Sequence, residues 1–156
     1  VGSKSEHGGI IKDGAKMVNA VSNSVVPKFT VIVGNSYGAG NYAMCGKAYD
    51  PRLIVSWPWA ELAVMGGSQA AKVLVQIQES TLKKQGKEIT TEEHNKLVEK
   101  ITQNYTKQTK VEYSAARIWV DAIINPLDTR KWISSGIEGA NNSPITDKFD
   151  LGDIQG

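Results

Sequence analysis

The chain has 156 residues, 40% of them hydrophobic and 22% charged, and its mean hydropathy of −0.29 is typical of one globular domain rather than a disordered or membrane-embedded chain. A formal net charge of +2 is too small to predict binding to nucleic acid or to an anionic membrane, and no apolar run approaches the roughly 20 residues of a spanning helix. The single cysteine, Cys45, excludes an internal disulfide and favours a reducing, intracellular compartment.

The first part of the chain is expected to hold a loop, a helix and a strand. Residues 1–9 are rich in glycine, serine and charge, which is typical of a loop. Over residues 9–23 apolar side chains recur every three or four positions, so this stretch predicts an amphipathic helix. The hydrophobic, β-branched run at 29–33 has the length of a buried strand.

The middle of the chain is expected to repeat one order of elements. The predicted elements are a turn at 34–40, a short helix at 41–48, strands at 53–55 and 61–65, and a helix at 68–74 that follows Gly66 and Gly67. The two glycine turns lie about 28 residues apart. This spacing predicts an α/β fold built from repeated strand-strand-helix units.

The rest of the chain is expected to be mostly helical. Residues 79–110 are polar and predict a solvated helical insert, with a helix start at Thr90 because Glu93 stands at the capping-box spacing. Residues 111–124 predict a helix, and a second helix is expected from Pro126 through Trp132. The tail after residue 139 is expected to be turn-like.

The glycine turn within FTVIVGNSYGAGNYAMCGKAY, residues 29–49, has three interpretations. Residues 38–43 match the G-x-G-x-x-A dinucleotide fingerprint, but the next strand ends without the acidic residue that holds a ribose, and Glu61 comes only after Pro58. A structural explanation is that small residues allow tight helix packing or a positive φ. The third interpretation is an oxyanion hole, in which unobstructed backbone amides at a helix start face an oxygen that gains negative charge.

Other candidates for chemistry are few. His7 and His94 are expected to be solvated, and the absence of a Ser-His-Asp order and of an H-E-x-x-H motif disfavours a hydrolase or a metalloprotease. Cys45 is interpreted as a small core residue. The four tryptophans are expected to pack in the core, with a pocket wall as the alternative for the first two: Trp57, Trp59, Trp119 and Trp132.

Two stretches of the chain carry a resemblance to a known family. GIIKDGAKMVNAVSNSVVPKFTVIVGNSYGAGNYAMCGKAYDPRLIVSWPWAELAVMGG and SAARIWVDAIINPLDTRKWIS resemble the carboxyltransferase β subunit of biotin-dependent acyl-CoA carboxylases. The Ser-Tyr-Gly-Ala-Gly-Asn-Tyr and Cys-Gly-x-Ala-Tyr patterns are more similar to the methylcrotonyl-CoA type than to the propionyl-CoA type. One departure is Ser68, which stands where methylcrotonyl-type relatives have Glu.

The resemblance implies a crotonase-like fold, a repeated ββα superhelix with a helical insert. Residues 1–156 would be the C-terminal, carboxybiotin-facing domain, and the N-terminal half that binds acyl-CoA would be absent. The active site would lie between the N half of one subunit and the C half of another, which implies a homo-oligomer. Further partners implied are a biotin carboxylase and a biotin carrier subunit, with no nucleic acid and no membrane.

The resemblance also implies an activity and a site. The activity would be carboxyl transfer from carboxybiotin to a short acyl-CoA such as methylcrotonyl-CoA or propionyl-CoA, in the cytoplasm or the mitochondrial matrix, with this fragment inactive alone. The backbone amides of Ala39 and Gly40 would form the oxyanion hole, Tyr37, Gly38 and Asn41 would complete the biotin site, and no metal is expected in this domain. The alternatives are a non-catalytic α/β assembly module and, less favoured, a dinucleotide-binding domain.

Overall fold

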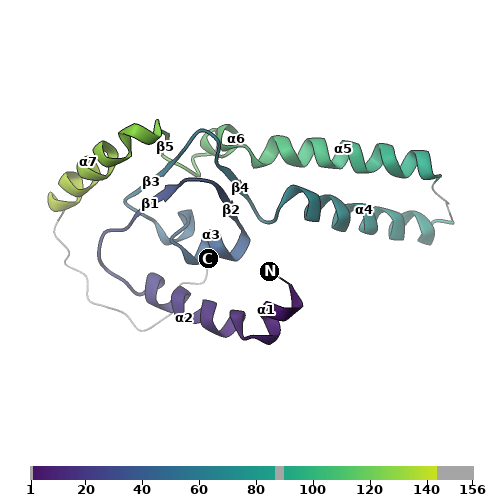
Figure 1. Cartoon of the computed structure of the whole chain (residues 1–156), viewed down its shortest axis with the longest axis horizontal. Coiled ribbons are helices and arrows are strands. Elements are labelled where there is room, and N and C mark those ends of the chain that lie inside the picture. The colour runs from purple at the N-terminus through teal and green to yellow at the C-terminus, as the bar shows by residue number, and fades with distance from the viewer. Residues whose placement is uncertain (1, 87–89, 144–156) are drawn as a thin grey trace.

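The computed structural model describes residues 2–86 and 90–143 of the chain. They form a small α/β body with a long helical hairpin that projects from it (Figure 1). Every pair of neighbouring strands named within these residues is parallel, and the strands divide into one three-stranded and one two-stranded sheet. The α/β class expected from the sequence is confirmed.

The two sheets arise from two consecutive strand-strand-helix units, as the sequence predicts. The first unit is β1 (Phe29–Ile32), β2 (Asn35–Tyr37) and α3 (Gly38–Ala43), and the second is β3 (Leu53–Ser56), β4 (Glu61–Ala63) and α4 (Gly67–Lys84). Because β1 pairs with β3 and β2 pairs with β4, each strand of the first unit lies beside its counterpart in the second. A short strand, β5 (Ala122–Ile123), joins the other edge of β3.

The segment 34–40 is not the continuous turn that was expected. Residues 35–37 form β2, and α3 already begins at Gly38 and ends at Ala43, followed by a 3-10 helix, Lys47–Tyr49. The strand is not visible in the sequence because Asn35 and Ser36 lack the apolar or β-branched side chains that favour strands. Pairing with β4 decides its conformation.

The hydrophobic core lies between the strands and the chain that follows the hairpin. Its buried members are Ile32, Ile54, Ala60, Leu62, Val111 and Val120. Val111 opens α6 (Val111–Ala115), so the chain returns from the hairpin into the same core that the strands fill. This return brings the base of the hairpin close to the two glycine turns.

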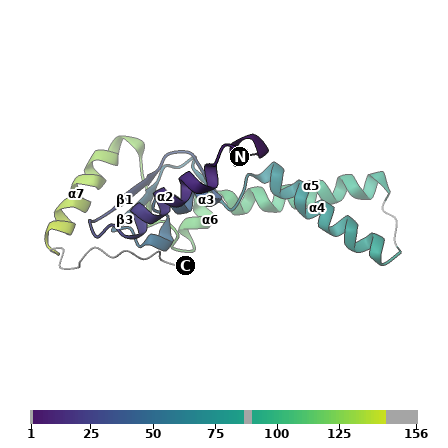
Figure 2. The same ribbon diagram turned by 90° about the horizontal axis from the view of Figure 1, so that it is seen from below.

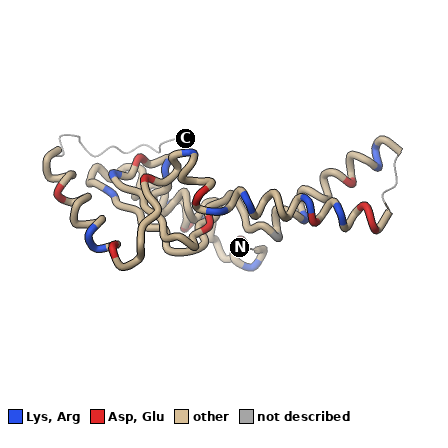
Figure 3. Tube along the Cα trace, turned by 90° about the horizontal axis from the view of Figure 1, so that it is seen from above, with Lys and Arg blue, Asp and Glu red and all other residues tan. Residues whose placement is uncertain are grey.

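The polar insert is helical, as predicted, and it forms a hairpin with the helix that precedes it. α4 and α5 (Thr91–Thr109) lie side by side and extend away from the body in both views (Figures 1 and 2). Basic and acidic residues both occur along it rather than one sign alone (Figure 3). An exposed, mixed-charge surface of this kind is what a solvated insert requires.

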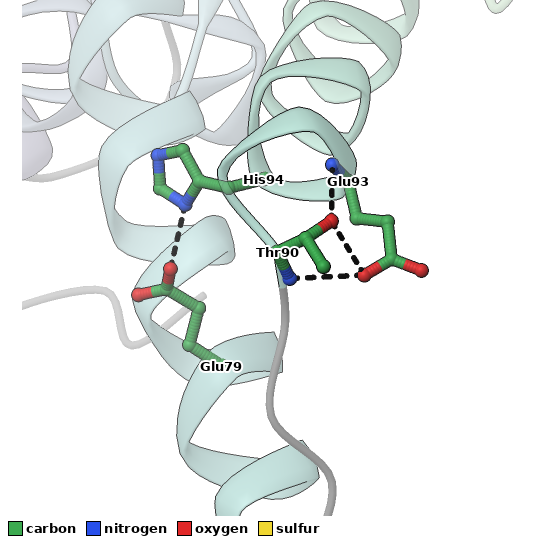
Figure 4. Close-up of polar contacts among 4 residues, drawn as sticks. All are labelled: Glu79, Thr90, Glu93 and His94. Carbon is green, nitrogen blue, oxygen red and sulfur yellow. Dashed lines mark hydrogen bonds and ion pairs between the residues drawn. The ribbon is translucent and has the colours of Figure 1, made fainter.

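The start of α5, at the outer tip of the hairpin (Figure 1), carries the predicted capping box. The Glu93 backbone N–H donates to Thr90 Oγ1, and the Thr90 backbone N–H donates to Glu93 Oε2 (Figure 4). His94 is not simply solvated, because its Nδ1 lies 2.6 Å from Oε1 of Glu79 on α4 (Figure 4). This pair links the two arms of the hairpin.

Two helices precede the first strand, where the sequence predicted a loop and one helix. The loop expected at 1–9 is wrong, since α1 (Ser3–His7) forms there, and Gly9, with a φ of +92°, precedes the next helix. α2 (Ile10–Ser22) is the predicted amphipathic helix. None of its residues is buried by the described part of the chain, so its apolar stripe stays accessible.

Residues 111–124 are not the single helix that was predicted. α6 ends at Ala115, Ile118 adopts a φ of +59°, and the chain then enters β5. The Asp121 carboxylate accepts a hydrogen bond of 2.8 Å from the Ile54 N–H, which fixes this loop to β3. Apolar residues at helix-like spacing misled the prediction because pairing with β3 overrides local preference.

The last described helix, α7 (Thr129–Asn141), confirms the helix predicted after Pro126. It follows a 3-10 helix, Pro126–Asp128, and continues beyond residue 139, where a turn-like tail was expected; the remainder of that tail, 144–156, lies outside the described residues. No helix in the described part of the chain is long and apolar enough to cross a bilayer.

Candidate functional site

The glycine turn starts where β2 ends and α3 begins. The structure explains why its first residue is glycine. Gly38 has a φ of +53°, in the left-handed region that side chains disfavour. A Cβ at Gly38 would also lie 2.6 Å from the carbonyl oxygen of Val64, just after β4. At this position the structural explanation is correct, because glycine lets the two units approach each other.

The described structure does not require glycine at the second glycine position of the turn. Gly40 lies inside α3 with a helical backbone, and a Cβ built on it meets nothing within 4 Å. Glycine in a helix interior costs about 1 kcal/mol relative to alanine. Ala39 and Gly40 are both exposed, so no packing in the described chain explains why a side chain is missing there.

The amides of Ala39 and Gly40 lie in the first turn of α3, where N–H groups lack the regular acceptor four residues earlier. In the described part of the chain, neither amide donates to an acceptor outside the helix, and Tyr37 provides no side-chain cap. α3 has only six residues, so its helix dipole adds little to the field at these amides. What the turn offers is two unobstructed backbone donors.

The two predicted site residues with polar side chains use them within the chain. Asn41 Nδ2 donates to Ser36 Oγ at 2.7 Å. Tyr37 Oη donates to Glu61 Oε2, and the pKa of Tyr37 is raised to about 12, first by burial and then by this hydrogen bond and the Glu61 charge. Tyr37 and Asn41 therefore hold the turn in place, while Ala39 and Gly40 face outward.

A cavity of about 450 Å³ lies on the other face of α3. Gly38 and Asn41 line it, but Ala39 and Gly40 do not. Its aromatic wall comes from α3, from the end of α5 near the α/β body, from α6 and from the loop after α6: Tyr42, Tyr105, Tyr113 and Trp119. A cavity of this size and composition suits a small organic ligand.

Sequence reasoning missed the wall that the hairpin contributes. Tyr105, Gln108 and Thr109 all line the cavity, yet they come from the segment expected to be a solvated excursion. The only signal is the lone aromatic, Tyr105, near the end of a polar helix. Its Oη donates to the Met65 carbonyl at 2.9 Å and accepts from the Met65 N–H at 3.3 Å, which fixes α5 to the second glycine turn.

The packing expected of two tryptophans is wrong within the described chain. Trp119 lines the cavity and is 44% exposed, and its ring meets Tyr113 edge-on at 6.0 Å. Trp59 is 61% exposed and donates to the Val33 carbonyl at 3.0 Å. Trp57 is half-buried and donates to Thr129, closer to the expected packing role, whereas Trp132 is partly exposed.

The two histidines and the cysteine are not among the described residues that line the cavity. His7 is exposed at the end of α1, and His94 is on the hairpin. Cys45 is buried, as expected of a core residue, with a φ of +66°. In residues 2–86 and 90–143, no group of three or more His, Cys, Asp or Glu could hold a metal ion.

Residues 1–149 match the sequence model of the carboxyl transferase domain. The chain belongs to the carboxyl transferase domain family. It is 46% identical over 150 residues to the mitochondrial methylcrotonoyl-CoA carboxylase beta chain of Dictyostelium discoideum, a match that covers 96% of this chain and 26% of that protein. It is 45% identical to the biotin-dependent 3-methylcrotonyl-coenzyme A carboxylase beta1 subunit of Mycobacterium tuberculosis, over 93% of this chain and 27% of that one.

A solved relative supports the same family and fold. The geranyl-CoA carboxylase beta subunit of Pseudomonas aeruginosa superposes with a TM-score of 0.76 at 38% identity, over 97% of this chain and 29% of that structure. The carboxyl transferase domain described here therefore has the crotonase-like fold of carboxyltransferase β subunits, as the resemblance implied. It spans about a quarter of the length of the relatives it matches.

Proposed function

We propose that this domain is the carboxybiotin-facing half of a carboxyltransferase site, which transfers a carboxyl group to a short acyl-CoA such as methylcrotonyl-CoA or propionyl-CoA. The observation that carries the proposal is Gly40, a helical glycine whose missing side chain leaves open space beside two unobstructed amides. Family membership and the biotin-dependent relative support the reaction class.

The donor set fits the group that the family uses. Carboxybiotin, when bound, would supply the carboxyl group, and its ureido oxygen would gain negative charge as that group leaves. The amides of Ala39 and Gly40 would donate hydrogen bonds to this oxygen, and donors fixed before the reaction stabilise charge without reorganisation. Loss of one such donor typically costs about 3 kcal/mol of transition-state stabilisation.

The other residues of the turn hold the two amide donors in position. The contact of Gly38 with the Val64 carbonyl sets where α3 begins, and Asn41 anchors α3 to β2 through Ser36. Tyr37 and Asn41 are therefore assigned to the support of the biotin site rather than to contact with biotin. The cavity beneath α3 is a candidate pocket for the apolar part of a ligand held at the turn.

The site requires more polypeptide than this chain contains. We infer an N-terminal half that binds acyl-CoA, a second subunit that completes the active site, and a biotin carboxylase with its biotin carrier, in the cytoplasm or the mitochondrial matrix. The unburied apolar stripe of α2 and the quarter-length coverage of the relatives support a larger assembly.

The test is Gly40→Ala in the full polypeptide that carries this segment, assayed with its biotin carboxylase and carrier components. Alanine fits the helical backbone and meets no atom, so the melting temperature should hold or rise, while turnover should fall about 100-fold because the methyl group obstructs the donors. Gly139→Ala is the matched control, since its Cβ in α7 also meets nothing.

Two results would separate the parts of this proposal. If Gly40→Ala turns over at the wild-type rate, the proposed role of the Ala39 and Gly40 amides is rejected. An inactive wild-type assembly would remove the carboxyltransferase function and favour the assembly module, which the exposed apolar side chains also suit.

A further inference from the structure

A phenol–carboxylate pair lies directly behind the glycine turn. Tyr37, the last residue of β2, donates a hydrogen bond from Oη to Glu61, the first residue of β4. In the strand register Tyr37 faces Ala63, so its side chain reaches back across the strand pair to Glu61. Both side chains are half-buried, which protects the bond from full competition with water.

Tyr37 is also the residue from which α3 starts. It occupies the N-cap position, immediately before Gly38, and its own side chain does not cap the helix. Among the described residues, two side-chain hydrogen bonds hold β2 and the start of α3: Tyr37 to Glu61, and Asn41 to Ser36. The second joins α3 to its own strand, whereas the first joins the turn to the other unit.

The same phenol ring touches the second glycine turn. A Cβ built on Gly66 would lie 3.8 Å from Cε2 of Tyr37, and the next residue, Gly67, faces the ring of Tyr105 in the same way at 3.7 Å. Tyr105 in turn holds the Met65 backbone through its hydroxyl. The Tyr37 ring therefore lies between the two turns, with its hydroxyl fixed by Glu61.

We propose that Tyr37 and Glu61 are positioning residues, which hold the amides of Ala39 and Gly40 in the place that carboxyl transfer requires. The inference rests on the proposed function and deepens it. Neither side chain touches the reacting atoms. Their hydrogen bond fixes Tyr37, the residue that precedes the helix turn carrying the two amide donors. Misplacement of a reacting group by about 1 Å can lower a rate about 100-fold.

The pair remains intact over the range of an activity assay. Burial, and then the Glu61 carboxylate, raise the pKa of Tyr37 to about 12, so the phenol keeps its proton and stays a donor. The carboxylate accepts a charge-assisted hydrogen bond, which is stronger than a neutral one.

The experiment compares Tyr37→Phe, Glu61→Leu and their double variant in the full polypeptide, assembled with its biotin carboxylase and carrier. Tyr37→Phe keeps the ring against Gly66 and removes only the hydroxyl, and we expect kcat to fall about 10- to 100-fold with KM for the acyl-CoA unchanged. Glu61→Leu should match it, and the double variant should be no slower than either, because both remove one interaction.

A rescue and a control exclude a purely structural effect. Glu61→Gln keeps an acceptor oxygen for the phenol and should retain most of the turnover. Glu79→Leu removes a half-buried carboxylate from its pair with His94 on the hairpin and should leave kcat unchanged. Rates are expressed per correctly folded site, by titration of bound biotin carrier.

The inference is overturned if Tyr37→Phe turns over at the wild-type rate, or if Glu61→Gln is as slow as Glu61→Leu. Should Tyr37→Phe fail to fold, the comparison of Glu61→Gln with Glu61→Leu decides alone. A slow Gly40→Ala beside a normal Tyr37→Phe would reject the positioning role and keep the carboxyltransferase function. An inactive wild-type assembly would reject the function, on which the positioning role depends.

Discussion

At the scale of single residues, the two glycines of the turn differ although they are two positions apart. The fold itself requires glycine at position 38, because of its positive φ and the nearby Val64 carbonyl. Nothing in the described chain requires glycine at position 40. The sequence suggests that the small residues serve packing or ligand approach, but only the three-dimensional structure shows which of these applies to each glycine.

Gly38→Ala tests the structural role. The added Cβ overlaps the Val64 oxygen, and the positive φ is strained for alanine, so the free energy of unfolding should fall by about 3 kcal/mol. Urea denaturation followed by circular dichroism measures the change. If Gly38→Ala is as stable as Gly40→Ala, the close approach of the two units is not required.

The pKa of Tyr37 makes a prediction about alkaline stability. Its folded-state pKa of about 12 lies above the ordinary value of 10.0, so its contribution to stability is complete below pH 10 and is lost as pH rises through 12. Between those values, wild-type stability should fall more steeply than that of Tyr37→Phe. Denaturation midpoints at several alkaline pH values give the slopes, and equal slopes would contradict the raised pKa.

At the scale of elements, strong local signals were predicted correctly and weak ones were not. The β-branched run of β1 and the capping box of α5 are visible in the sequence because their own residues favour those structures. β2 and β5 are not, since each is decided by a neighbouring strand that is distant in the sequence. The cavity escaped prediction for the same reason, because the hairpin brings Tyr105 to Gly38 only in the folded chain.

The capping box at Thr90 should stabilise the hairpin measurably. Thr90→Ala leaves the Glu93 amide without its acceptor and should cost about 1 kcal/mol. The hydrogen bonds from Thr90 lower the pKa of Glu93, so stability from this group is lost as pH falls through that lowered value. Hydrogen exchange of the α5 amides should be faster in Thr90→Ala, and unchanged exchange would argue against the cap.

The packing of α7 on the first sheet depends on one glycine. A Cβ on Gly136 would lie 2.8 Å from Cε1 of Phe29 and 3.3 Å from Cδ2 of Leu53, so Gly136→Ala should destabilise the fold by about 1–2 kcal/mol. Gly139→Ala, on the same helix with nothing near its Cβ, should stabilise it by about 0.5–1 kcal/mol. Equal effects in thermal denaturation would show that α7 does not pack as described.

At the scale of the whole molecule, the domain leaves much apolar surface uncovered. Large hydrophobic side chains are exposed on several elements: Ile11, Met44, Val64, Ile77, Ile118 and Leu127. Monomeric proteins rarely expose large contiguous apolar patches, and such patches mark interaction surfaces. The two ββα units and the family were predictable from the sequence, whereas this exposure follows only from what the described residues fail to cover.

The isolated domain should therefore associate in solution. Static light scattering at rising concentration should give a mass above 16.9 kDa, because the exposed apolar surfaces of separate copies of the domain bind each other. Co-expression with the rest of the polypeptide should suppress this association. A monodisperse monomer at high concentration would contradict a large missing interface.

The hairpin has a consequence for protein engineering. Its contacts with the α/β body are concentrated at the base, where Tyr105, Gln108 and Thr109 lie near the end of α5. Seven residues span about two turns of a helix, so deleting one heptad from the outer part of each arm would shorten the hairpin and keep its facing surfaces aligned. A trimmed protein of this kind offers a smaller scaffold with the aromatic wall of the cavity still in place.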